Sequence, residues 1–159
     1  MAGNRTMTSI RHEIWVDAPV EAVYRLLGTA QGISSWWDQQ TERRTEAGLI
    51  WEHSPGPEHG TVQMLVTRRE PNRMLQWKCI SEHKPSTPAS AWTGTVVTFM
   101  LADRSASKVA SAAWAQSIPV QTVLFFTHEG WDEASPYLGF CNTAWAEVLQ
   151  MLAKKAQGT

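Results

Sequence analysis

Alternation of apolar and polar residues is the first pattern in the chain. In residues 10–16, Ile10, Ile14 and Val16 share one face, and polar residues occupy most positions between them. A period of two is typical of a strand with one buried face. Similar segments, separated by turns rich in Gly, Pro, Asn and Ser, predict six more strands. We expect two short ones within residues 39–53 and one each at 61–70, 74–80, 93–101 and 121–128.

Helical spacing follows the first strand. Asp17 is suited to an N-cap and Pro19 to an early helical position, and apolar residues then recur every three or four positions from Val20 to Leu27. Residues 33–37 predict a second, short helix or turn that carries two adjacent tryptophans.

A long helix is expected at the C-terminal end of the chain. It begins at Pro136, with Ser135 as its N-cap, and runs to about Ala156. Its apolar stripe consists of Leu138, Cys141, Trp145, Val148, Leu149 and Leu152.

The order strand, helix pair, six strands and long helix predicts an α+β fold. Consecutive strands with short connections favour an antiparallel meander, and the long helix must bury its stripe against the concave side of that sheet. At 159 residues, the chain has room for one domain. We expect this domain at 10–156, after a flexible N-terminus at 1–9 and before a tail at 157–159. Residues 103–119, rich in Ala and Ser, fit either a long loop or a short amphipathic helix around Trp114.

Tryptophan is unusually frequent, with nine residues against four Phe and two Tyr. Such a number is compatible with thick apolar packing, a roomy apolar cavity or an exposed aromatic surface. The tryptophans are distributed over the predicted helices, the strands and the 103–119 link, which argues against a single exposed surface.

Charge and cysteine content narrow the function classes. Fourteen basic and fifteen acidic residues give a net charge of −1, and short basic pairs make no phosphate track, so we expect no nucleic-acid binding. The polar N-terminus lacks a signal-peptide pattern, and no apolar run approaches a membrane span, so we expect a cytoplasmic protein. Cys79 and Cys141 lie in apolar neighbourhoods, where free buried thiols are expected, with a disulfide or redox pair as the alternative.

Several segments, in this order, resemble the START-like superfamily, also called SRPBCC or the birch-pollen-allergen helix-grip fold. Within it, the chain looks most like the bacterial branch related to the activator of heat-shock-protein-90 ATPase. The matching segments are APVEAVY at 18–24, WW at 36–37, WKC at 77–79, WTGT at 92–95 with Phe99, FTHEGW at 126–131, and CNTAW at 141–145 with Leu149 and Leu152. The departure is at 103–119, where this superfamily normally has a tight turn.

The resemblance implies a curved, antiparallel, seven-stranded sheet wrapped around the C-terminal helix, with an apolar cavity between them. Superfamily members bind lipids, sterols, polyketides and other apolar molecules, a minority are cyclases or hydrolases, and some are co-chaperones, so the fold does not fix the function. We expect binding of a small hydrophobic or amphipathic molecule of the lipid, polyketide or aromatic class. The alternatives are a co-chaperone-like interaction protein with a chaperone partner, or a cyclase- or hydrolase-type enzyme. A homodimer is also compatible with the resemblance.

Strand alternation, the helix stripe and the resemblance together nominate ten residues for this cavity. They either fill the gap between sheet and helix or line it, because pockets and cores use the same side chains. The ten are Trp36, Trp37, Trp77, Val97, Phe99, Leu124, Phe126, His128, Cys141 and Trp145.

The histidine among these ten raises the question of chemistry. His128 shares a strand face with Leu124 and Phe126, so it should point inward, where it could orient a ligand, act as an acid or base, or be satisfied by a structural partner. His12, on the inward face of the first strand, raises the same question with less weight.

Other chemical motifs are not found. His53 and His59 flank a Pro-Gly loop, but their spacing matches no standard zinc pattern. There is no nucleophile elbow and no glycine loop for phosphate, and the acidic residues after His128 are typical of a solvated strand end. We therefore expect no metal and no cofactor, and we assign no catalytic residue.

Overall fold

One seven-stranded antiparallel sheet organises the fold. The computed structural model describes residues 5–158. The strands lie in the order β1-β7-β6-β5-β4-β3-β2, so the first strand pairs with the last and the others form a meander. Their bounds are β1 (Met7–Val16), β2 (Thr41–Thr45), β3 (Gly48–His53), β4 (Val62–Glu70), β5 (Met74–Cys79), β6 (Val96–Ala102) and β7 (Thr122–Asp132). The predicted α+β class and seven-stranded antiparallel sheet are confirmed.

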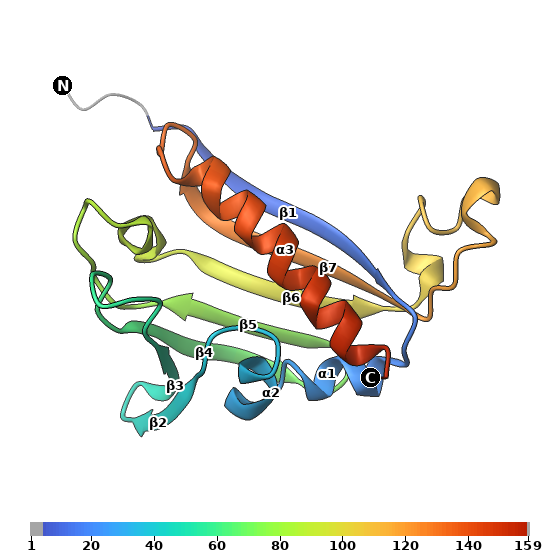
Figure 1. Ribbon diagram of the computed structural model, residues 1–159, viewed down its shortest axis with the longest axis horizontal. Helices are drawn as coiled ribbons and strands as arrows, with labels where there is room; N and C mark the ends of the chain where they lie inside the picture. The colour runs from blue at the N-terminus through green and yellow to red at the C-terminus, as the bar shows by residue number, and fades with distance from the viewer. Residues whose placement is uncertain (1–4, 159) are drawn as a thin grey trace.

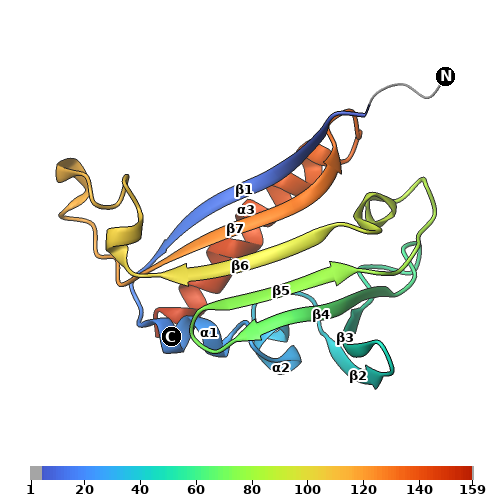
Figure 2. The same ribbon diagram turned by 180° about the vertical axis from the view of Figure 1, so that it is seen from behind.

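The long helix α3 (Leu138–Ala156) lies along the concave face of the sheet, as Figure 1 shows, and the view from behind in Figure 2 shows the opposite, convex face. Its stripe is buried at Cys141, Trp145, Leu149, Leu152, Ala153 and Ala156. Two short helices, α1 (Val20–Arg25) and α2 (Ala30–Ser34), follow β1. This arrangement is the helix grip that the resemblance implied.

Two helix starts differ from the sequence prediction. Asp17 does not cap α1, because its carboxylate accepts a hydrogen bond from Gln121 Nε2 at 3.0 Å, and Pro19 takes the N-cap position without a side-chain bond. Helix α3 begins at Leu138 rather than Pro136. Ser135 Oγ accepts the Tyr137 backbone N–H at 3.2 Å, which makes a turn before the helix instead of a cap on it.

The first strand is longer than its alternation indicated. It starts at Met7, because Met7 and Thr8 pair with Asp132 and Trp131 of β7 across an irregularity in register after Thr8. Polar residues on this extension gave no periodic signal, and only pairing with the neighbouring strand shows that it is part of the sheet.

Strand register determines which side chains meet on the concave face. One row across the sheet contains Trp77, Val97, His128 and Ile10, because each is paired with the next. The neighbouring row places Phe99 beside Phe126 in the same way. These side chains are buried and form a continuous core with α3.

Residues 103–121 form an ordered excursion between β6 and β7, with two short 3-10 helices, η2 (Arg104–Ala106) and η3 (Ala113–Ala115). The Arg104 guanidinium holds it together by donating to the carbonyls of Ala110 at 2.8 Å, Ile118 at 2.6 Å and Ala115. Of the two expected forms, a loop and an amphipathic helix, the structure shows the loop. It extends beyond one end of the sheet in Figures 1 and 2.

The excursion contacts β1. Ser107 Oγ donates to the Glu13 carboxylate at 2.6 Å, and the rings of Trp114 and Trp15 lie 6.2 Å apart. Trp114 remains 66% exposed. Within residues 5–158, no helix has the length and apolar character required to cross a membrane.

Candidate functional site

Four tryptophans meet at one end of the core, from the α2 C-terminal region, β5, the 3-10 helix η1 (Pro88–Trp92) and α3. Trp37 stacks on Trp77 with ring centroids 6.1 Å apart, and Trp92 stacks on Trp145 at 5.6 Å. Trp37 and Trp145 join the two pairs at 5.1 Å. The neighbouring Trp36 is fixed by its indole N–H, which donates to the Leu26 carbonyl at 2.7 Å.

His128 connects this cluster to the sheet by hydrogen bonds. Its Nδ1 accepts the Trp145 indole N–H at 3.1 Å, and its Nε2 donates to Thr95 Oγ1 at 2.7 Å. The Thr95 hydroxyl in turn donates to the Trp92 carbonyl at 2.5 Å. Burial lowers the pKa of His128 to about 3, so the ring is neutral near pH 7. Because both ring nitrogens of His128 are bonded to protein groups, this geometry favours a structural role for His128 over ligand orientation or acid-base chemistry.

A pocket of about 340 Å³ lies beside the cluster, between the N-terminal half of α3, η1 and the loop that joins β3 to β4. Its walls are mostly apolar, and Phe140, 62% exposed, stands among them. The lining residues are Trp37, Asp38, His53, Pro55, His59, Val62, Pro88, Ala89, Trp92, Phe140, Cys141, Ala144, Trp145 and Val148.

Of the ten residues nominated from the sequence, three line this pocket and seven fill the core around it. The lining ones are Trp37, Cys141 and Trp145. The others are Trp36, Trp77, Val97, Phe99, Leu124, Phe126 and His128, and all of them are buried. The structure therefore divides the set between the two roles that the sequence left open, and ligand contact by any of them remains a prediction.

Sequence reasoning missed several lining residues, and their signals were present but weak. Trp92 was placed only as the residue before a strand. His53 was weighed only as a metal ligand, although it follows Leu49 and Trp51 at strand alternation, which places all three on the concave face. Asp38 carried no pattern at all.

A second, polar hollow of about 400 Å³ adjoins the pocket. It is lined by Asp38, Gln39, Thr41, Glu52, His53, Ser54 and Thr61. Asp38 and His53 line both hollows, so the apolar pocket and the polar hollow share a boundary formed by these two side chains.

His53 has an unsatisfied polar atom at this boundary. The residue is 5% exposed, its ring centroid lies 4.7 Å from that of Trp37, and its Nδ1 has no hydrogen-bond partner among the residues that the structure describes. Burial, with a smaller contribution from His83, lowers the pKa of His53 to about 4, so the imidazole is neutral near pH 7. His59 Nδ1 is likewise buried without a partner. Buried polar atoms are normally bonded, so these two nitrogens are exceptions, and a ligand would reach them only after neighbouring side chains move.

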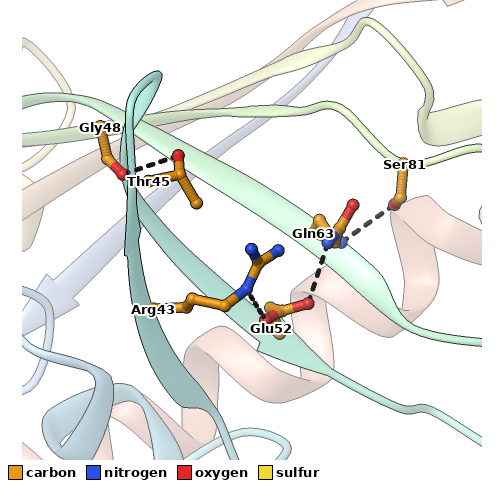
Figure 3. A network of polar contacts seen from close by, with 6 residues as sticks. All are labelled: Arg43, Thr45, Gly48, Glu52, Gln63 and Ser81. Atoms are coloured by element: carbon orange, nitrogen blue, oxygen red, sulfur yellow. Dashed lines mark hydrogen bonds and ion pairs between the residues drawn. The ribbon is translucent and has the colours of Figure 1, made fainter.

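Glu52, which lines the polar hollow, has hydrogen-bond partners, in contrast to the His53 Nδ1 atom (Figure 3). Its carboxylate accepts from Arg43 Nε at 2.9 Å and from Gln63 Nε2 at 2.9 Å, and these bonds hold the pKa of Glu52 below its usual value. The Gln63 backbone N–H continues the network by donating to Ser81 Oγ at 2.9 Å. At the far end of the strand pair, Thr45 Oγ1 bonds the Gly48 carbonyl at 3.2 Å.

The same network positions the loops around the pocket. The Ser81 hydroxyl bonds His83 Nε2 at 2.7 Å, and His83 Nδ1 donates to the His59 carbonyl at 2.5 Å. This chain of bonds ties the β3–β4 loop to the segment that follows β5. Within the described part of the chain, no three or more His, Cys, Asp or Glu side chains are grouped so as to hold a metal ion.

Both cysteines are free and buried, as the sequence predicted. Burial raises the pKa of Cys79 and of Cys141, so both are thiols near neutral pH. Cys141 therefore contributes an apolar surface to the pocket, without nucleophilic character.

Comparison with known proteins places the fold. No protein-family model and no curated protein matches the sequence. The chain is similar to the solution structure of the Aha1 dimer from Colwellia psychrerythraea, with 25% identity over 96% of this chain and 98% of that one and a TM-score of 0.70. Protein MLL2253 from Mesorhizobium loti is 20% identical, with 93% and 96% covered and a TM-score of 0.66. CalU16 from Micromonospora echinospora is 18% identical, with 96% and 78% covered and a TM-score of 0.64.

The fold and the pocket beneath the long helix define a helix-grip protein. More specifically, the chain has a START-like fold related to that of the Aha1 structure, as its sequence resemblance implied.

Proposed function

We propose that this protein binds a small, mainly apolar, planar molecule in the pocket beneath the N-terminal half of α3. The observation that supports the proposal best is the pocket itself, about 340 Å³ in volume and walled by Trp37, Trp92 and Trp145. Ligand sites are typically apolar hollows of about 300–1,000 Å³ with a few polar groups that fix orientation. The dimer described for the Colwellia protein extends the proposal to self-association of this chain.

The pocket also narrows the ligand class. Its volume is at the lower end of the usual range, which favours a compact ligand over a long acyl chain. Three indole rings supply flat apolar faces, against which an aromatic ligand packs in offset-stacked or edge-to-face geometry. Of the lipid, polyketide and aromatic classes, the pocket supports the aromatic one best.

Filling the pocket from α3 tests the proposal. Ala144 lines it, so Ala144→Phe would place a ring in the space that the ligand needs. We expect A144F to weaken binding of naphthalenemethanol, a neutral aromatic probe, by about tenfold or more, because the probe loses its apolar contacts. Isothermal titration calorimetry measures the change.

Thr143→Phe is the matched control, since Thr143 is exposed on the same helix and is not part of the pocket wall. It adds the same ring and should leave binding unchanged. Urea unfolding of both variants shows whether the fold is retained. Equal binding by A144F and wild type would place the site elsewhere, and no binding of aromatic probes by wild type would refute the proposed function.

A further inference from the structure

The formally charged residues that line the two hollows are both acidic. Among residues 5–158, Asp38 is the only formally charged residue that lines the apolar pocket, and the polar hollow adds only Glu52. No lysine or arginine of this described part lines either hollow. A ligand carboxylate or phosphate would thus meet Asp38 without a compensating cation.

Asp38 and Glu52 are not equivalent. The charge of the Glu52 carboxylate is compensated by Arg43, whose Nε donates to it at 2.9 Å. The Asp38 carboxylate makes no hydrogen bond or ion pair with any of residues 5–158, and partial burial raises its pKa. Asp38 is an exposed residue whose carboxylate has no partner among these residues, so its charge is open to a ligand, and a cation beside it would favour the charged form.

The buried His53 extends this preference. At neutral pH the His53 ring is uncharged, and with its proton on Nε2 the unpartnered Nδ1 presents a lone pair. An ammonium group has three N–H donors and no acceptor, so it suits the Asp38 carboxylate, and it would gain an imidazole acceptor if the neighbouring His53 ring turned its Nδ1 towards the pocket.

The aromatic wall suits the same ligand. Trp37 joins the two parts of the site, because it lines the apolar pocket, precedes Asp38 in sequence and packs its ring against His53. A cation near the face of an indole is stabilised by the ring quadrupole, and tryptophan is the best aromatic partner for this interaction. The apolar part of the ligand would then lie deeper, against Trp92 and Trp145.

Resting on the proposed function, we propose that the pocket selects arylalkylammonium ions, with the ring in the apolar pocket and the ammonium group at the boundary formed by Asp38 and His53. The selection is electrostatic and geometric: among the described residues, one unpaired carboxylate, a buried acceptor without a partner, and no lining cation.

Three naphthalene probes that differ in one substituent test the selection. Naphthylmethylamine is cationic at pH 7, naphthalenemethanol is neutral and naphthylacetate is anionic. We expect the amine to bind wild type about fivefold or more tightly than the alcohol, and the acetate to bind more weakly than the alcohol. Titration calorimetry at pH 7 and low ionic strength gives the three dissociation constants.

Asp38→Asn removes the charge and keeps the side-chain shape. We expect the advantage of the amine over the alcohol to fall to about twofold or less in D38N, while the alcohol binds as in wild type. Glu58→Gln is the matched control, because Glu58 is an exposed acid of the neighbouring β3–β4 loop that does not line either hollow. E58Q should keep the full preference for the amine.

The possible failures are distinguishable. If the alcohol binds but the amine has no advantage, or if D38N and E58Q reduce it equally, charge selection by Asp38 is wrong and the proposed function stands. If none of the three probes binds to wild type, the proposed function itself fails.

Discussion

At the scale of single residues, His128 links the sheet to the helix through two hydrogen bonds that only a neutral ring can make together. Its Nδ1 must be unprotonated to accept from Trp145, and burial opposes the charged form. Protonation would therefore break a bond and place a charge in the core. This makes His128 a source of pH-dependent stability.

The sign of this dependence follows from the two pKa values. In the unfolded chain, His128 takes up its proton near the ordinary histidine pKa of 6.5, whereas in the folded protein it resists protonation down to about pH 3. The stabilisation is complete above pH 6.5 and is lost as the pH falls towards 3. Wild type should lose about 2 kcal/mol more unfolding free energy than His128→Gln between pH 7 and pH 5. Urea titrations at several pH values measure the difference.

Thr95→Val provides the control for that experiment. It removes the hydroxyl that bonds His128 Nε2, so stability should fall by roughly 1–3 kcal/mol at every pH. The histidine remains buried, so the slope with pH should stay close to that of wild type. A slope in H128Q equal to that of wild type would show that His128 does not carry the dependence.

Sequence-based prediction for single residues succeeded where the alternation of side chains along a strand determines which way a residue points. The inward position of His128 followed from Leu124 and Phe126 on the same strand face, and the structure confirms it. Its partners could not be derived, because Thr95 and Trp145 are distant in sequence and meet it only through strand register and helix packing. Asp38 was missed for a different reason, because one acidic residue after a tryptophan pair has no periodicity.

At the scale of elements, the 103–121 excursion is the part of the chain that departs from the tight turn usual in the superfamily. It has no apolar periodicity and no long helix, yet it buries Ala110 and Ala115 completely. Its order depends on Arg104, whose planar guanidinium reaches three carbonyls at once. Such cross-links to backbone atoms leave no trace in a hydrophobic pattern, which explains why the sequence could not choose between loop and helix.

Arg104→Lys tests this role. A lysine ammonium cannot satisfy three carbonyls in the fork geometry of arginine, so the excursion should open locally. We expect amide hydrogen exchange across residues 107–118 to become about tenfold faster or more, measured by mass spectrometry.

The effect should stay local. The excursion leaves the C-terminal end of β6, whereas η1, which forms part of the pocket wall, comes before the N-terminal end of β6. The excursion and η1 are therefore at opposite ends of this strand. Arg68→Lys is the control, because Arg68 pairs only with Glu70 on the exposed part of β4. Unchanged exchange in R104K would show that packing, not Arg104, orders the segment.

At the scale of the whole molecule, the wall of the pocket and the core are one body of side chains. Trp145 contacts Trp37 and Trp92 beside the pocket, and its ring lies 4.5 Å from that of Phe126 in the core. Sequence reasoning reached this architecture through the resemblance and the helix stripe. It could not tell which side chains fill the core and which line the pocket, because that depends on the backbone positions of η1 and the β3–β4 loop.

This continuity predicts a single cooperative unfolding transition. Tryptophan emission reports on the aromatic cluster and far-UV circular dichroism on the sheet and α3, so their urea transitions should coincide. Trp114→Phe removes the most exposed indole and should leave the midpoint unchanged, because Trp114 lies outside the core cluster. If emission changed at a lower urea concentration than the dichroism, the pocket end would unfold by itself, and the tryptophan cluster would be a separate subdomain resting on the sheet.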